Sequence, residues 1–233
     1  IMVGQPENIP LAILACIVVA VLSGIVTGLI VAVIDITPLV TTLSMNSILF
    51  GAALVYTGGA PFGEAAKAFV VIGTGRVFGV PAPTLIWALL AGLLFYLTRR
   101  TIFGRWLYAT GANKDAARMM AVPVERVTVA AYVLSALMAM VGGLLLTAYV
   151  GSPSLGIGNQ FLFTSVAAVV VGGAALTGGV GGIIATVGGA IFITELASFT
   201  NIVRVSTGTQ YVMQGAIIIL SVVLYRRLSG AHR

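Results

Sequence analysis

Charged residues are scarce in this sequence, at 8% of its 233 positions, whereas hydrophobic residues reach 59%. Soluble domains carry about 25% charged residues, so the composition excludes an ordinary soluble protein. Apolar runs close to the roughly 20 residues that cross a bilayer recur along the whole chain. We therefore expect an all-α fold, a polytopic helical bundle surrounded by a lipid bilayer.

Cysteine and histidine are almost absent as well. Cys16 is the only cysteine, so the chain can form no internal disulfide and no thiolate metal site. His232, the only histidine, lies in the tail, which argues against histidine-based catalysis and histidine-rich metal centres. The sequence therefore predicts neither catalytic residues nor a metal site.

A phosphate-binding loop is missing too. Such a loop ends in Gly-Lys-Ser/Thr, but Lys67 precedes Ala68 and Lys114 precedes Asp115. We expect no ATP site and no cofactor in this chain. The hydrophobic runs also offer too few acids and nucleophiles for an intramembrane enzyme, and the chain is predicted not to be an enzyme.

About seven hydrophobic stretches are long enough to be membrane spans. A long connection at 57–82 separates the second stretch from the third, and one short surface helix is expected inside it at 64–70. The predicted spans cover approximately residues 10–34, 38–56, 83–98, 127–150, 160–176, 183–199 and 210–225.

Basic residues are concentrated in two places. Of the twelve Lys and Arg residues, six lie between Arg99 and Arg126 and three in the tail, at Arg226, Arg227 and Arg233. Short loops rich in Lys and Arg face the cytoplasm, so both places are predicted to be cytoplasmic. The net charge of +6 then reflects topology, and we expect no nucleic-acid partner.

The beginning of the chain has no basic segment followed by a cleavage site, so no signal peptide is expected. Counting spans back from the central cytoplasmic loop places Ile1 on the outside. An outside start predicts further helices upstream of Ile1.

Two pairs of glycines have the four-residue spacing that is typical of closely packed membrane helices. They are Gly24 with Gly28, and Gly178 with Gly182. We expect both pairs to bring helices into close contact.

The central cytoplasmic segment GANKDAARMMAVPVER (111–126) holds five charged residues in sixteen. Asn113 is a good N-cap, Asp115 suits the positive start of a helix, and Pro123 should end that helix. From its residues alone, the short helix can lie on lipid, pack under the bundle, have no role, or dock on a cytoplasmic partner. A small apolar face is expected from Ala116, Ala117, Met119 and Met120.

Two longer stretches, YATGANKDAARMMAV (108–122) and AAVVVGGAALTGGVGGIIATVGGAIF (167–192), resemble the permease subunits of ribose-, xylose- and galactose-type ABC sugar importers. The stretch TPLVTTLSMNSILFGAALVYTGGAPF (37–62) is also similar, so the resemblance covers nearly the whole chain. The matching positions are Gly111, Asn113, Ala116 and Ala117 in the first motif, and Gly172, Gly173, Gly178, Gly179 and Gly181 in the second.

The resemblance implies a coupling helix in the central segment, which transmits motion from an ABC ATPase subunit. It implies one transmembrane permease domain over 1–233, with a cytoplasmic coupling loop at 99–126. The family has about ten spans, the first of them upstream of Ile1, and usually a glycine at the position of Ala121. The residues implied in coupling are Gly111, Asn113, Lys114, Asp115, Ala116, Ala117, Arg118, Met119 and Met120.

Three kinds of partner and a location are implied in the same way. They are a cytoplasmic ABC ATPase, a periplasmic or extracellular solute-binding protein, and a second permease copy in a homodimer. The location is the bacterial inner membrane, with the C-terminus and the loop 99–126 in the cytoplasm. The binding protein would dock on the outside loop near Glu64, Lys67 and Arg76, although a solvated loop also explains these residues.

Polar residues in the spans are candidates for a solute path, because polar groups are rare and often functional inside membranes. Each of them can equally stabilise the contact between helices. The candidates are Asn46, Glu195, Gln210 and Gln214.

Together these features predict a permease subunit that forms the path for a small hydrophilic solute, with a monosaccharide favoured, and that is coupled to a separate ATPase. A nucleoside, a sugar-like signal or an amino acid would fit the same machinery. A secondary transporter driven by an ion gradient, or a membrane scaffold without transport activity, would also be compatible with the sequence.

Overall fold

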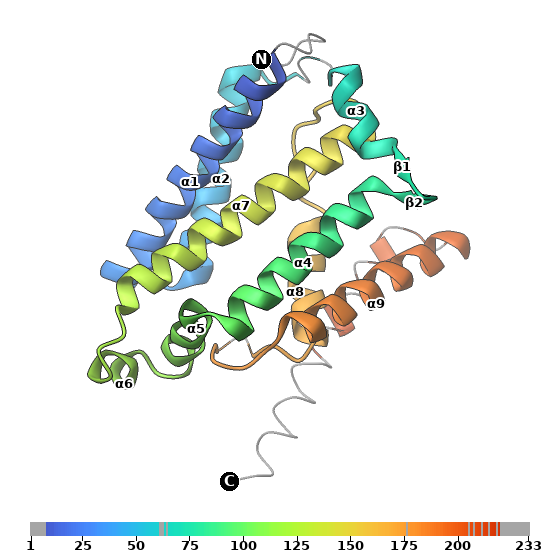
Figure 1. The fold of residues 1–233 in the computed structure, drawn as a ribbon. Coiled ribbons are helices and arrows are strands. Elements are labelled where there is room, and N and C mark those ends of the chain that lie inside the picture. Colours follow the sequence, from blue (N-terminus) through green and yellow to red (C-terminus); the bar gives the residue numbers. More distant parts are fainter. Residues whose placement is uncertain are drawn as a thin grey trace. The chain divides into compact units, whose positions relative to one another are not determined.

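The computed structural model describes residues 8–60, 63, 65–175, 177–204, 206, 208–210, 212, 213, 215–217 and 219. These residues are almost entirely helical, with one short hairpin (Figure 1). The elements are α1 (Ile9–Val33), α2 (Pro38–Thr57), α3 (Lys67–Thr74), β1 (Arg76–Val77), β2 (Val80–Pro81), α4 (Ala82–Arg100), α5 (Ile102–Ala112), α6 (Lys114–Met119), α7 (Val124–Val150), α8 (Phe161–Val171) and α9 (Ile183–Ile202).

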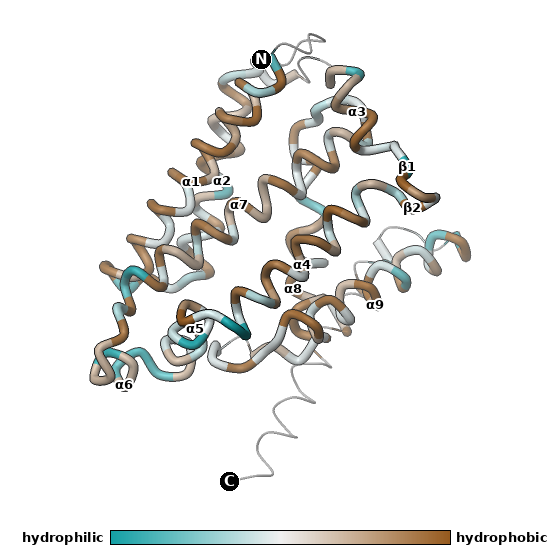
Figure 2. Tube along the Cα trace, in the orientation of Figure 1, coloured by the Kyte–Doolittle hydropathy of each residue, from teal (hydrophilic) through white to brown (hydrophobic). Residues whose placement is uncertain are grey.

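Five of the described helices, α1, α2, α4, α7 and α9, are long and apolar enough to cross a membrane. Hydrophobic residues cover these helices, and hydrophilic ones gather at α5 and α6 (Figure 2). The all-α, polytopic architecture expected from the composition is confirmed.

The span predicted at 160–176 is wrong in its extent. Helix α8 has only 11 residues, and it ends where the chain turns at Gly172 and Gly173, the latter with φ +76°. At 1.5 Å per residue α8 is about 16 Å long, which is too short to cross the hydrocarbon layer. The span predicted at 210–225 lies mostly outside the described residues.

The chain forms two compact units. The first unit comprises Ile1–Leu90 and Ala117–Ile157, and the second comprises Ala91–Ala116 and Gly158–Arg233. The expectation of a single permease domain over 1–233 stays a prediction.

In the first unit, α1 packs along α7 through its glycines. A Cβ atom on Gly24 would lie 2.6 Å from the Cα of Val133, and one on Gly28 would lie 2.7 Å from the Cα of Val129. The two helices therefore touch backbone to backbone, which confirms the close packing predicted for Gly24 and Gly28. Helix α2 also contacts α1.

The connection between α2 and α4 contains α3 and the hairpin. Phe69, 5% exposed, packs with the fully buried Ala148 of α7. Gly73 lies directly against the backbone of Ala148. The short helix predicted at 64–70 is therefore shifted to Lys67–Thr74, because the face that α3 buries against α7 extends from Phe69 to Gly73.

In the second unit, α8 packs against α9 around Ile193, which is 1% exposed. A Cβ atom on Gly172 would lie 2.6 Å from the carbonyl oxygen of Ala185, so this crossing also needs glycine. The prediction that Gly178 and Gly182 mark a helix contact is wrong. Gly178 lies in the loop before α9 with φ +95°, a backbone conformation outside the helical region.

Candidate functional site

A cap begins α6. The side-chain Oδ1 of Asn113 accepts hydrogen bonds from the backbone N–H groups of Asp115 and Ala116, both at 3.0 Å. The N-cap expected from the sequence is thus present. Asp115 lies in the first turn of α6, where the positive end of the helix favours a carboxylate.

A left-handed residue ends α6. The backbone N–H of Val122 donates to the carbonyl of Ala117 at 3.1 Å, and that of Ala121 donates to the carbonyl of Arg118 at 3.0 Å. These two bonds form a Schellman motif, whose turning residue is Ala121 with φ +58°. The prediction that Pro123 ends the helix is wrong, because the chain has already turned at Ala121.

Ala121→Gly is expected to stabilise the protein by about 1 kcal/mol, because glycine adopts the left-handed conformation without the steric penalty of a Cβ atom. Thermal unfolding of the detergent-solubilised protein measures the effect as a higher midpoint. Ala116→Gly, within α6, is the matched control and should lower the midpoint, because glycine is unfavourable inside a helix. A midpoint that Ala121→Gly leaves unchanged or lowers would contradict the proposed strain.

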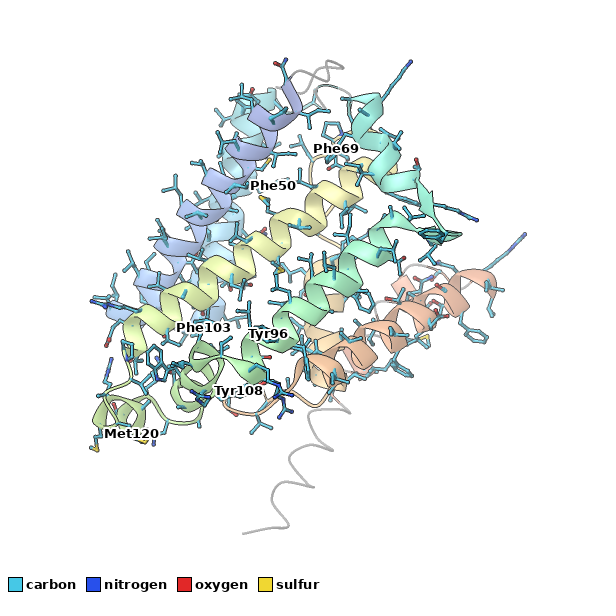
Figure 3. All side chains as sticks on the ribbon, viewed as in Figure 1. Phe50, Phe69, Tyr96, Phe103, Tyr108 and Met120 are labelled. Atoms are coloured by element: carbon cyan, nitrogen blue, oxygen red, sulfur yellow. The ribbon has the colours of Figure 1, made fainter. Side chains whose placement is uncertain are left out.

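The sequence predicted one apolar face for Ala116, Ala117, Met119 and Met120. In the structure these residues do not share a face. Ala117 is fully buried, whereas Met119 is 89% exposed and Met120 66% exposed. The side chain of Met120 lies at the tip of this bend in the chain (Figure 3). Successive helical residues point about 100° apart, so burying Ala117 leaves Ala116 and Met119 outside.

An ion pair connects the end of α6 with the start of α7 in the first unit. Nη2 of Arg118 lies 2.8 Å from Oε1 of Glu125, and Nε of Arg118 donates to the same oxygen at 3.2 Å. Both side chains are 50% exposed, so the pair adds at most about 1 kcal/mol of stability. Its main effect is to orient Arg118 toward α7.

The two sequence motifs that resemble the importer permeases lie against each other in the second unit. A Cβ atom on Gly111 would lie 2.6 Å from the backbone N of Gly179, and one on Gly178 would lie 2.7 Å from the carbonyl oxygen of Gly111. Close by, the Tyr108 hydroxyl donates to the carbonyl oxygen of Gly181 at 3.0 Å. The end of α5 and the loop before α9 are thus in direct main-chain contact.

A cavity of about 880 Å³ lies in the first unit, with walls from α1, α2 and α7. The walls are mostly apolar, but Asn46 of α2 and Tyr132 of α7 bring an amide and a phenol to them. Within the part of the chain that the structure describes, neither polar group has a hydrogen-bond partner. Asn46 thus lines this cavity, and its role in a solute path stays a prediction.

Glu195 and Gln210, two of the remaining path candidates, belong to the second unit. Glu195 is exposed on α9, and it forms no ion pair with Arg204 or with any other basic residue that the structure describes. The Nε2 of Gln210 donates to Oδ1 of Asn201 at 2.9 Å. Gln214 lies outside the described residues, and the transport roles of all these residues stay predictions.

The proposed docking residues of the outside loop are only partly described. Lys67 is the first residue of α3 and Arg76 the first of β1, while Glu64 lies outside the described residues. Their part in docking a binding protein stays a prediction.

The model of a protein family described as "Branched-chain amino acid transport system / permease component" matches residues 1–222. The chain belongs to this permease family. Curated relatives are named for sugars: the permease is 33% identical to the ribose import permease protein of Escherichia coli (strain K12) over 226 residues, which cover 95% of the permease and 70% of that relative.

Two further relatives extend the comparison. The L-arabinose transport system permease protein of Escherichia coli (strain K12) is 34% identical over 212 residues, 89% of the permease and 63% of the relative. The ribose import permease protein of Bacillus subtilis (strain 168) is 35% identical over 205 residues, 87% of the permease and 64% of the relative. No solved structure matches the permease. The predicted resemblance to sugar importer permeases is confirmed.

Sequence reasoning missed Tyr108 and Tyr132 as site residues. Tyr108 opens the YATGAN stretch three positions before Gly111, so one helical turn joins it to the motif. Tyr132 is a phenol within an apolar run, and its hydroxyl was a signal that a polar contact or a polar space lies nearby.

Proposed function

We propose that the permease forms the membrane path of an ATP-binding-cassette importer for a monosaccharide. The observation that carries this proposal is the alignment of 95% of the chain with a ribose import permease, together with the L-arabinose relative. The family description names branched-chain amino acids, so an amino acid is the competing solute. The exposed, capped helix α6 supports coupling to another subunit.

In this proposal a cytoplasmic ATPase subunit binds α6. The permease itself has no phosphate-binding loop, because neither lysine is followed by Ser or Thr. Met119 and Met120 offer apolar anchors beside the charges of Lys114, Asp115 and Arg118, and a short helix of this kind fits a groove on its partner. The basic residues of 99–126 favour a cytoplasmic position for the segment that carries α6.

Further partners complete the importer. A second copy of the permease would enclose the path in a homodimer, and a solute-binding protein would deliver the sugar to the outside loop at 57–82. The location is the bacterial inner membrane, with the C-terminus in the cytoplasm. Alternating access would arise from two packing states of the helices that ATP binding and hydrolysis interconvert.

The solute path is proposed to pass along the cavity of the first unit. Sugar hydroxyls donate and accept hydrogen bonds, and the Asn46 amide and the Tyr132 phenol can do the same. Because these two groups have no partner within the described residues, they are available to a solute. Glu195, Gln210 and Gln214 are further candidate path residues.

Asn46→Leu is expected to lower sugar uptake about fivefold, because a lost hydrogen bond to the solute is worth about 1 kcal/mol. The fold should survive, since the Asn46 amide makes no bond within the described residues. Ser47→Ala is the matched control on α2: its hydroxyl donates only to the carbonyl of Leu43, at 3.1 Å, and uptake should be normal. Normal uptake by Asn46→Leu would remove this residue from the path.

The function is tested by uptake into proteoliposomes that contain the permease, its ATPase subunit and its binding protein. Labelled ribose, L-arabinose and leucine are supplied with and without ATP. We expect ATP-dependent accumulation of a pentose. ATP-dependent accumulation of leucine alone would overturn the sugar assignment, and uptake driven by an ion gradient without ATP would identify a secondary transporter.

A further inference from the structure

We propose that Tyr108 is a positioning residue for coupling, which holds α5 and the loop before α9 together as one rigid joint. The joint consists of Tyr108, Gly111 and Ala112 of α5 with residues 178–181 of the loop. The inference rests on the proposed function, because coupling has meaning only in an ATP-driven permease. The joint itself lies entirely within the second unit.

Main-chain contact makes the joint stiff. A Cβ atom on Gly179 would lie 2.7 Å from the Cα of Ala112, and Gly179 has φ +74°, where a side chain is strained in any case. Gly111 and Gly178 approach each other equally closely. Side chains can change rotamer to absorb a displacement, but backbone atoms in van der Waals contact cannot. A movement of the α5 end therefore moves the loop.

The hydroxyl of Tyr108 resists separation of the two parts. It donates to the carbonyl oxygen of Gly181 at 3.0 Å across 73 positions of sequence. Thr110, also near the end of α5, is 8% exposed, but its hydroxyl has no partner within the described part of the chain. Among the described residues, Tyr108 thus provides the side-chain hydrogen bond between α5 and the loop.

Along the chain, the joint lies between α6 and α9. Asn113, the cap of α6, directly follows Ala112 on one side. On the other side Gly182 is the N-cap of α9, a 20-residue helix that packs on α8. Motion imposed on α6 by a partner can therefore pass through α5 and the loop into α9, without any change in the contacts of the joint.

The test compares Tyr108→Phe with Tyr149→Phe, a matched control whose side chain is 67% exposed on α7. Sugar uptake and ATP hydrolysis are measured together in liposomes that contain the complete importer. We expect Tyr108→Phe to bind the ATPase subunit and to hydrolyse ATP at the unsubstituted rate. The amount of sugar transported per ATP hydrolysed should fall about two- to tenfold, which is the effect of one lost hydrogen bond. Tyr149→Phe should leave this ratio unchanged.

The outcomes of this comparison separate the two proposals. An unchanged ratio in Tyr108→Phe overturns the role of Tyr108 and leaves the proposed function intact. Absence of ATP-driven sugar uptake in the unsubstituted permease overturns the proposed function itself.

Discussion

Replacing Met119 and Met120 together by serine is expected to reduce ATP-driven uptake by the permease more than tenfold. The two side chains are 89% and 66% exposed, so the fold loses little packing when they are shortened. A partner that buries both would lose two apolar anchors, each worth about 1 to 2 kcal/mol in a typical interface. The loss should therefore appear in the binding of the ATPase subunit.

Capture of the purified ATPase subunit by the solubilised permease measures this binding, with uptake measured in parallel. Phe78→Ser is the matched control, because Phe78 is fully exposed in the turn between β1 and β2, outside the predicted coupling loop 99–126. This control should bind the ATPase normally. Normal binding by the double methionine variant would mean that these residues are not the docking anchors.

Gly24→Leu is expected to prevent stable folding of the permease, with a loss of about 3 kcal/mol or more. Its Cβ atom would lie 2.6 Å from the Cα of Val133 and 3.0 Å from the carbonyl oxygen of Tyr132. Backbone atoms cannot rotate away, so α1 would have to separate from α7, and the walls of the cavity would separate with them.

Size-exclusion chromatography in detergent and the thermal unfolding midpoint measure this effect. Gly51→Leu is the matched control, since a Cβ atom on Gly51 of α2 would meet open space. We expect the control to elute as a single peak and Gly24→Leu to aggregate. Equal behaviour of the two variants would contradict the close contact between α1 and α7.

Local features were predicted correctly because they depend on residues close in sequence. The apolar run that became α1 and the Asn113 cap of α6 are examples. A cap involves only the next three residues, and a span needs only continuous hydrophobicity. The end of α6 was mispredicted because two features there can end a helix. The chain already turns at Ala121 in a Schellman motif, before it reaches Pro123.

Identical spacing led to opposite results at the two glycine pairs. Gly24 and Gly28 lie within a long apolar helix and let it touch α7. Gly178 and Gly182 flank further glycines, and Gly178, Gly179 and Gly181 adopt positive φ values instead of forming a helix. A four-residue spacing places two glycines on one face only if the segment between them is a helix. The spacing does not show whether that helix forms, so it could not distinguish the two pairs.

Composition and short-range pattern were enough to determine the class of protein, five of its apolar spans, the capped start of α6 and the lack of a phosphate-binding loop. These properties follow from hydrophobicity and from hydrogen bonds between neighbours, which the order of residues specifies directly. Only the tertiary structure decided that Ala117 turns inward while Met119 stays exposed, that Asn46 shares a cavity with Tyr132, and that Tyr108 reaches Gly181. Such contacts join residues far apart in sequence, and they form because close packing of whole helices brings particular faces together.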